Sequence, residues 1–329
     1  MTVGLAVPFF HAMPVADYVA LAREAEARGY DTAWVAEVAG ADAVTTMTLV
    51  ASSTTRLRVA TGVVPIQTRT PIVLGLTAAT LGRIAPGRIA LGLGVSSPVI
   101  VSQWHGLPWG RPVRQMREAV QVIRMVLSGE RVTFEGEHYR IRNFRMSAPP
   151  PSPPVRIYLG ALGPAMLELA GELADGVLLN WLAPATVRAS LPHLERGAKR
   201  AGRTLEGFEI AAFVRTCVTD RPEAARQWLA RDITGYAVVD AYAAFFRGAG
   251  YADEVDAVQR AWRAGDRAGA VARISPRMLD DLGVVGPAAS CRARIAEFAA
   301  AGLTMPVVFP FSPDPDPVPS LLATVRTFP

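Results

Sequence analysis

Few side chains in this chain of 329 residues can exchange a proton near neutral pH, and they are the first candidates for catalysis. Histidine titrates closest to neutrality, and the chain contains four histidines. His11 follows the first apolar segment and His105 lies in a Gln-Trp-His-Gly stretch, and we take both as catalytic candidates. Glu37, which ends the second apolar segment, is the third candidate, with a structural salt bridge as its alternative role. His138 and His193 fall in an expected hairpin and an expected helix, so we expect them to be structural or solvated.

The rest of the composition narrows the classes of ligand. Lys199 is the only lysine among 34 basic residues, and the formal net charge is +5. The arginines form no dense basic run, so we expect a small-molecule substrate and no nucleic-acid partner. No apolar run reaches about 18 residues, which argues against a membrane span. The first residues have no basic segment and predict a strand rather than a signal peptide. Cys217 and Cys291 lack metal-ligand spacing, so we expect no metal and a reduced, cytoplasmic protein.

Eight apolar segments, most of them rich in β-branched residues, can form strands that would position these groups. They are residues 3–7, 32–37, 57–63, 88–93, 155–159, 176–181, 208–219 and 306–311. Most are continuous apolar runs, which is typical of parallel strands covered by helices. Helical patterns lie between them, and several begin with proline. The alternation predicts an α/β fold, a (β/α)8 TIM barrel, with insertions after strands four and seven. We expect residues 1–329 to form a single domain.

Residues 57–71 form the most informative stretch of the sequence. A β-branched strand pattern runs into Gly62 and then into Val-Val-Pro. Pro65 has no N–H to donate to a ladder, so the strand cannot continue easily and the backbone must change near Gly62 and Val63. From these residues alone, an ordinary strand end is a sufficient explanation.

Several segments together resemble the bacterial luciferase-like oxidoreductases, which use a flavin or a deazaflavin. Within that superfamily the chain is similar to the branch that uses coenzyme F420, an 8-hydroxy-5-deazaflavin, and includes methylenetetrahydromethanopterin reductase. The matching segments follow the family's order and are residues 31–42, 60–71, 87–98, 103–112, 155–182 and 201–203.

The resemblance implies that the flat ring of F420 lies at the C-terminal ends of the barrel strands. A bulge with a non-proline cis peptide at Gly62–Val63 would place an apolar wall behind one face of the ring. The residues that would form this part of the site are Thr61, Gly62, Val63, Val64 and Pro65.

The resemblance also places the rest of the cofactor. Its phosphate would bind at the start of a helix, where backbone N–H groups and the helix dipole attract anions, and at the end of the sixth strand. The residues expected there are Gly160, Ala161, Leu162, Gly163, Asn180 and Trp181. Gly94, Ser96 and Ser97 end the fourth strand and would face the ring edge or the ribityl chain. These residues do not make a dinucleotide-binding motif, because no clear helix follows them.

Two catalytic residues of some relatives are missing. Val38 stands where some relatives carry a histidine, and Ala6 stands where others carry a glutamate. We therefore expect an F420-dependent oxidoreductase that passes a hydride to or from a small organic substrate, assembled as a homodimer, without naming its proton donor. The alternatives are an FMN-dependent monooxygenase that uses O2 and a barrel that binds a cofactor without catalysis.

Four of the arginines in the second insertion, residues 248–282, are candidates for binding the cofactor. Arg263, Arg267, Arg273 and Arg277 could form a cationic lid over the oligoglutamate tail of F420, because guanidinium groups pair well with carboxylates. The alternative is a solvated helix face.

Overall fold

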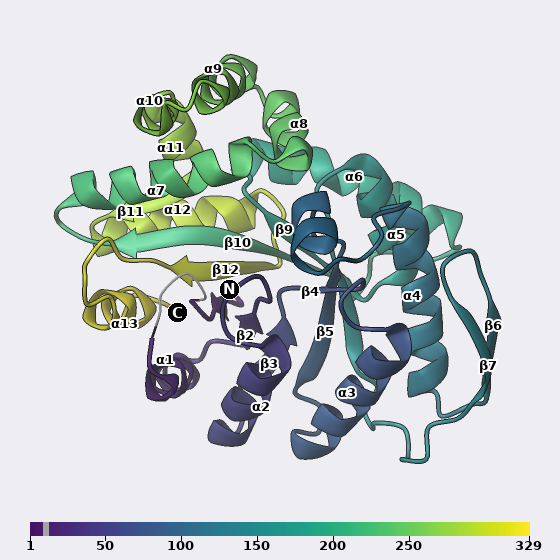
Figure 1. Cartoon of the computed structure of the whole chain (residues 1–329). Helices are drawn as coiled ribbons and strands as arrows, with labels where there is room; N and C mark the ends of the chain where they lie inside the picture. The colour runs from purple at the N-terminus through teal and green to yellow at the C-terminus, as the bar shows by residue number, and fades with distance from the viewer. Residues whose placement is uncertain (9–12) are drawn as a thin grey trace.

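Eight parallel strands close into a barrel in the computed structural model, which describes residues 1–8 and 13–329 (Figure 1). The barrel strands, in spatial order, are β1 (Gly4–Ala6), β2 (Thr32–Val35), β3 (Arg58–Thr61), β5 (Ile89–Gly94), β8 (Arg156–Gly160), β9 (Gly176–Asn180), β10 (Glu209–Val218) and β12 (Met305–Pro310). The barrel closes because β1 pairs with both β2 and β12. The (β/α)8 TIM barrel expected from the sequence is confirmed.

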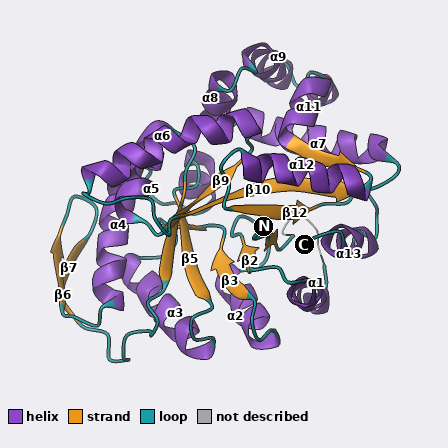
Figure 2. Ribbon diagram, turned by 180° about the vertical axis from the view of Figure 1, so that it is seen from behind, coloured by secondary structure: helices purple, strands orange, loops and turns teal. Residues whose placement is uncertain are grey.

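Helices surround the barrel (Figure 2). They are α1 (Val15–Arg28), α2 (Ala43–Ser53), α3 (Pro71–Ile84), α4 (Pro112–Leu127), α5 (Pro164–Leu173), α6 (Pro184–Arg200), α7 (Pro222–Ala237), α12 (Ala288–Ala300) and α13 (Val318–Arg326). Local sequence sets their ends: proline opens five of them, and the Asp42 carboxylate accepts the Thr45 N–H at 2.7 Å at the start of α2. Gly29, with φ of 84°, ends α1 in the left-handed conformation that glycine favours. Among the described residues, no helix is both long and apolar enough to cross a membrane.

The inside of the barrel is filled by side chains from alternating strand positions. Large rings meet there: Trp34 lies edge-on to Tyr158 with ring centroids 5.1 Å apart, and Phe213 packs on Phe309 at 5.4 Å. The remaining positions in this cluster include small residues such as Ala60. The opposite face of the strands packs against the helices in a larger apolar core. The barrel is therefore a packed core, and ligands must bind at its ends.

Polar groups close the N-terminal ends of the strands, which we call the floor. Arg58 donates to Asp31 Oδ1 at 2.7 Å and to Glu209 Oε2 at 3.0 Å. The Tyr158 hydroxyl donates to Glu209 Oε1 at 3.0 Å. Burial opposes the charge of Arg58, but Glu209 and Asp31 outweigh it and raise the pKa of the guanidinium. The floor is thus a network of mutually satisfied groups.

The two insertions extend the barrel on different sides (Figure 1). After β5 come a π-helix, η1 (Val99–Trp104), where no helix was expected, and beyond α4 the expected hairpin of β6 (Val132–Glu135) and β7 (Arg140–Phe144). After α7 come α8 (Asp240–Gly248), α9 (Ala252–Arg263), α10 (Arg267–Ala272) and α11 (Pro276–Leu282). These helices bury their own apolar cluster against α7.

Two details of the second insertion differ from the sequence prediction. Residues 223–246 have one continuous helical pattern, which predicts a single helix, but they form two helices, because Val239 is extended and turns the chain between α7 and α8. An additional strand, β11 (Gly283–Gly286), pairs with β10 from Arg215 to Val218. It forms because β10 continues beyond Phe213, its last partner position on β9, and leaves an edge to be covered.

Candidate functional site

The C-terminal end of β3 contains a bulge. Ala60 pairs with Ala90, and Val64 pairs with Leu93, so three residues oppose two between these points. The Thr61 hydroxyl fills the gap: it donates to the Gly92 carbonyl at 2.7 Å and accepts the Gly92 N–H at 2.8 Å. The peptide bond between Gly62 and Val63, inside the bulge, is cis.

The strand resumes beyond the bulge, although the sequence predicted that it could not continue easily because of Pro65. A short strand, β4 (Val64–Pro65), pairs with the end of β5, and the next residue, Ile66, donates its N–H to the Gly94 carbonyl at 3.0 Å. The missing N–H of Pro65 does not interrupt the pairing with β5, because the hydrogen bond to the Gly94 carbonyl is donated by Ile66.

Glycines on the neighbouring strands make room for one side chain of the bulge. A Cβ at Gly94 would lie 2.3 Å from Val63 Cγ2, and a Cβ at Gly160 would lie 3.3 Å from Val63 Cγ1. Val63 therefore lies over the ends of β5 and β8 and is only partly buried. Val64 and Pro65 are buried, and Val64 packs in the core between strands and helices. Of the three apolar residues expected to form the wall, Val63, Val64 and Pro65, only Val63 has an accessible side chain.

The loop after β8 leads directly into α5. Ala161 is buried and donates its N–H to the Leu178 carbonyl at 3.3 Å, whereas Leu162 is half-buried and Gly163 is exposed. Gly163 is the residue before the helix, and a Cβ added there would meet no atom within 4 Å. The first N–H groups of a helix lack intrahelical partners, so this open helix start can bind an anionic group.

Ser96 and Ser97 follow β5 at the same end of the barrel. Both are half-buried, and Ser96 has a φ of 58°, in the left-handed region. The Ser97 hydroxyl accepts the Ile100 N–H at 3.4 Å, and its carbonyl accepts the Val101 N–H at 2.9 Å, so Ser97 starts η1. Ser96 is therefore the more available of the two hydroxyls.

Asn180 and Trp181, at the end of β9, have side chains directed into the protein. The Asn180 carbonyl oxygen accepts from Arg215, and its amide donates to the Tyr242 hydroxyl at 2.9 Å. Trp181 is buried, with its ring centroid 4.0 Å from the guanidinium carbon of Arg215. A ligand at this point could contact backbone or ring edges but would have to displace Arg215 or Tyr242 to reach the amide.

Arg215 is the main functional-site residue that the sequence prediction missed. Its side chain is 1% exposed, lies between the rings of Trp181 and Phe309, and has Asp232 Oδ2 3.4 Å from its Nε. Burial raises the pKa of Asp232, although Arg215 acts in the opposite direction. The sequence signal for it was an arginine inside the mostly apolar segment 208–219.

Of the three candidates for proton transfer, Glu37 and His105 lie in the described part of the chain. Glu37 accepts from Arg69 at 2.8 Å and from the Ala43 N–H at 3.3 Å, so the alternative role as a salt bridge at the rim is realised. The hydrogen bond to Glu37 raises the pKa of Arg69. His105 caps η1 and is exposed, and its side chain has no partner among residues 1–8 and 13–329. His11 lies outside the described residues.

No group of three or more His, Cys, Asp or Glu within residues 1–8 and 13–329 could hold a metal ion.

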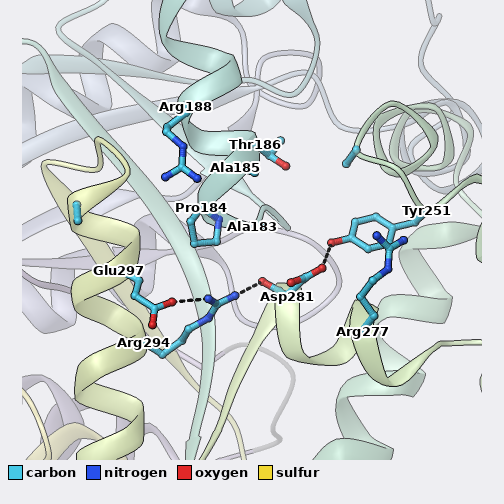
Figure 3. Close-up of a pocket in the computed structure, with 12 residues that line it drawn as sticks. Ala183, Pro184, Ala185, Thr186, Arg188, Tyr251, Arg277, Asp281, Arg294 and Glu297 are labelled. Carbon is cyan, nitrogen blue, oxygen red and sulfur yellow. Dashed lines mark hydrogen bonds and ion pairs between the residues drawn. The ribbon is translucent and has the colours of Figure 1, made fainter.

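A cleft of about 550 Å³ lies elsewhere, between the start of α6, α11 and α12 (Figure 3). None of the residues predicted to hold the ring or the phosphate of the cofactor lines it. It therefore does not mark the ring site, which is defined by the strand ends described above.

Residues 1–305 match the luciferase-like monooxygenase family, and the chain therefore belongs to that family. It is an oxidoreductase. A putative coenzyme F420-dependent oxidoreductase of Mycobacterium tuberculosis is 34% identical, with 94% of each chain covered. The 5,10-methylenetetrahydromethanopterin reductase of Methanolobus tindarius is 30% identical, with 92% of each chain covered. The solved structure of the coenzyme F420-dependent tetrahydromethanopterin reductase from Methanopyrus kandleri superposes with a TM-score of 0.83 at 23% identity, covering 100% of this chain and 99% of that one. This last similarity shows the shared barrel fold.

Proposed function

We propose that the protein is an F420-dependent oxidoreductase that transfers a hydride between the deazaflavin and a small organic substrate. The observation that carries the proposal is the position of Val63 over Gly94 and Gly160, beside the open start of α5. The similarity to relatives named as F420-dependent or as methylenetetrahydromethanopterin reductases supports the choice of cofactor.

The residues present fit both ends of this cofactor. The space left by the missing Cβ atoms of Gly94 and Gly160 is occupied by Val63, so that an apolar surface lies where a flat ring would rest. The start of α5 offers backbone N–H groups to a phosphate. A bound 5-deazaflavin supplies hydride chemistry and, with carbon in place of N5, activates oxygen poorly.

The protein's part in the reaction is mainly to position the reactants. Val63 covers one side of the proposed ring site, so the substrate must approach from the other side. Glu37 and Arg69 form a charged pair near the bulge, because the Glu37 N–H also donates to the Val63 carbonyl at 3.3 Å. His105 is the candidate for proton exchange whose side chain the described residues leave unpaired. Its replacement by alanine tests that role through the pH dependence of turnover.

Titration of the purified protein with F420 and with FMN tests the choice of cofactor. We expect F420 to bind, seen as a change in deazaflavin fluorescence, and FMN to bind weakly or not at all. Tight binding of FMN without binding of F420 would overturn the proposal in favour of an FMN-dependent monooxygenase.

Stopped-flow oxidation of reduced F420 across candidate acceptors then tests catalysis. Turnover with any acceptor excludes a barrel that only binds its cofactor. The homodimer expected from the sequence stays part of the proposal, and light scattering on the purified protein measures it directly.

A further inference from the structure

The cleft outside the barrel is lined by three arginines from three separate elements. Figure 3 shows Arg188 of α6, Arg277 of α11 and Arg294 of α12 around it. Only two lining residues are acidic, Asp281 and Glu297. The cleft therefore carries an excess of positive charge within a defined volume, as a site for an anion requires.

The charges of these arginines are satisfied to different degrees. Arg294 pairs with Glu297 and donates to the Asp281 carbonyl at 3.3 Å, so its position is fixed by the protein. Arg277 lies over the Tyr251 ring at 4.6 Å, donates to the Gly250 carbonyl at 2.6 Å and has the Glu254 carboxylate 3.5 Å away. Arg188 is exposed and makes no hydrogen bond or ion pair with the described residues. The whole Arg188 guanidinium group thus remains available for an incoming carboxylate, and so do the N–H groups of Arg277 that do not bond to Gly250.

The cleft begins where the proposed phosphate site ends. Ala183 is the first residue along the chain that lines the cleft, and it is two positions after Trp181, the last residue of the proposed cofactor site. The start of α6, which lines the cleft, therefore follows the proposed cofactor residues directly in the chain, and α6 packs closely on α5, whose start is the proposed phosphate site. A chain that leaves that phosphate can continue over the end of β9 into the cleft.

We propose that this cleft binds the carboxylates of the oligoglutamate tail of F420, through Arg188 and Arg277. The inference rests on the proposed function, because it assigns a place to one part of the same cofactor. Each glutamate adds a carboxylate along an extended chain, and arginine binds carboxylates through paired, charge-assisted hydrogen bonds.

The structure changes the cationic lid considered from the sequence. Of its four arginines only Arg277 lines the cleft, and Arg188 and Arg294 take the other places. Arg267 lies 3.6 Å over the ring of Trp262 and donates to that residue's carbonyl. Arg263 shares the oxygen of Gln259 at 3.3 Å. Arg263 is therefore a suitable control: an arginine of the same insertion outside the cleft.

The test compares two forms of the cofactor: F420 with its glutamates, and a truncated form that ends before the first glutamate but keeps the phosphate. Fluorescence titration gives the dissociation constant of each with the wild-type protein and with Arg188→Glu, Arg277→Glu and Arg263→Glu. We expect the wild type to bind the tailed form more tightly. Arg188→Glu and Arg277→Glu should each weaken the tailed form by about tenfold, as for the loss of one charge-assisted hydrogen bond, and leave the truncated form unchanged.

The control distinguishes an effect of the cleft from an effect of net charge, because Arg263→Glu changes the net charge of the protein by the same amount as the other two variants. It should leave the binding of both forms as in the wild type. Equal binding of the two forms by the wild type, or equal weakening by all three variants, overturns the inference while leaving the proposed function intact. Binding of neither form overturns the proposed function itself. Arg188 is exposed and unpaired, so its variant should melt at the wild-type temperature, which confirms that it is folded.

Discussion

Each end of the barrel has an arginine on the inner face of its strands, and the two arginines differ in their carboxylate partners and in their exposure to solvent. At the floor, Arg58 has two carboxylates, Asp31 and Glu209, and keeps 21% of its side chain exposed. At the C-terminal ends of the strands, the mouth, Arg215 has one carboxylate, is 1% exposed and lies between aromatic rings. The floor arginine completes a network that closes the barrel. The mouth arginine instead fixes Asn180 and Trp181, where the cofactor is proposed to bind.

The same contrast holds for the glycines. Gly176 at the floor makes room for the Tyr158 ring, which is part of the closed network. Gly94 at the mouth makes room for Val63, which is partly exposed. A glycine that makes room for a neighbouring side chain therefore stabilises one end of the barrel and shapes a binding surface at the other. The following changes test this contrast in matched pairs.

The largest effect is expected for Arg215→Met. It leaves the Asp232 carboxylate buried without its cation, which should lower the free energy of unfolding by about 3–5 kcal/mol. The double variant Arg215→Met with Asp232→Leu should recover most of that loss, because it removes both charges. Arg58→Met should cost less, since Asp31 is 36% exposed and Glu209 keeps the Tyr158 hydroxyl and Arg156 as partners. Urea unfolding measures all three, and an equal or larger loss for Arg58→Met would contradict the comparison.

A second pair adds one methyl group at each end. In Gly94→Ala and in Gly176→Ala the new Cβ would lie 2.3 Å from a side-chain atom, of Val63 and of Tyr158 respectively. Both should lose about 1–3 kcal/mol of stability through overpacking. Only Gly94→Ala displaces the proposed ring wall, so it alone should weaken F420 binding, by about tenfold or 1.4 kcal/mol. Thermal melts and fluorescence titrations give the two quantities, and equal F420 affinity of the two variants would remove Val63 from the site.

A third pair concerns carboxylates that each accept three consecutive backbone N–H groups. Glu26 accepts those of residues 55–57, next to the floor, and Glu118 those of residues 137–139, in the turn of the hairpin. Burial acts to raise both pKa values, but the N–H donors outweigh it and hold them below the ordinary value of 4.5. The ionised forms therefore stabilise the fold above about pH 4.5, and this is lost as the pH falls through the folded pKa.

The variants Glu26→Gln and Glu118→Gln should each cost about 1.5–3 kcal/mol at pH 7, as for hydrogen bonds to a charged group. The difference from the wild type should shrink as the pH is lowered towards 3. Urea unfolding at several pH values measures it. A difference that stays constant with pH would mean that the charge of the carboxylate contributes nothing.

The smallest effect is expected for a pair of tyrosine hydroxyls. Tyr139 of the hairpin donates to the Ile66 carbonyl at 3.2 Å, directly after β4, and Tyr30 donates to the Val325 carbonyl at 3.0 Å, far from the mouth. Replacement of either by phenylalanine should cost about 1 kcal/mol of stability. Tyr139→Phe should also weaken F420 binding, because Ile66 follows the proposed wall, whereas Tyr30→Phe should not. An unchanged affinity of Tyr139→Phe would show that the hairpin does not support the site.

Much of the fold could be predicted because its signals are local. Continuous apolar runs marked the eight barrel strands, and prolines marked the helix starts, to within a few residues of the observed bounds. Gly62 and Pro65 located the irregularity in β3. The strand β11 had no such signal, because it forms only to cover the part of β10 that extends past its neighbour.

The sequence by itself determined the barrel, the position of the bulge and the glycines that make space around it, because periodicity, proline and glycine act on the neighbouring backbone. Tertiary structure decided which side chains face the mouth. In the tertiary structure, Val64 packs in the core and Glu37 pairs with Arg69. Arg215 is buried beside Trp181. Three separate helices bring Arg188, Arg277 and Arg294 into one cleft. These outcomes depend on contacts between residues far apart in the chain, which no local pattern specifies.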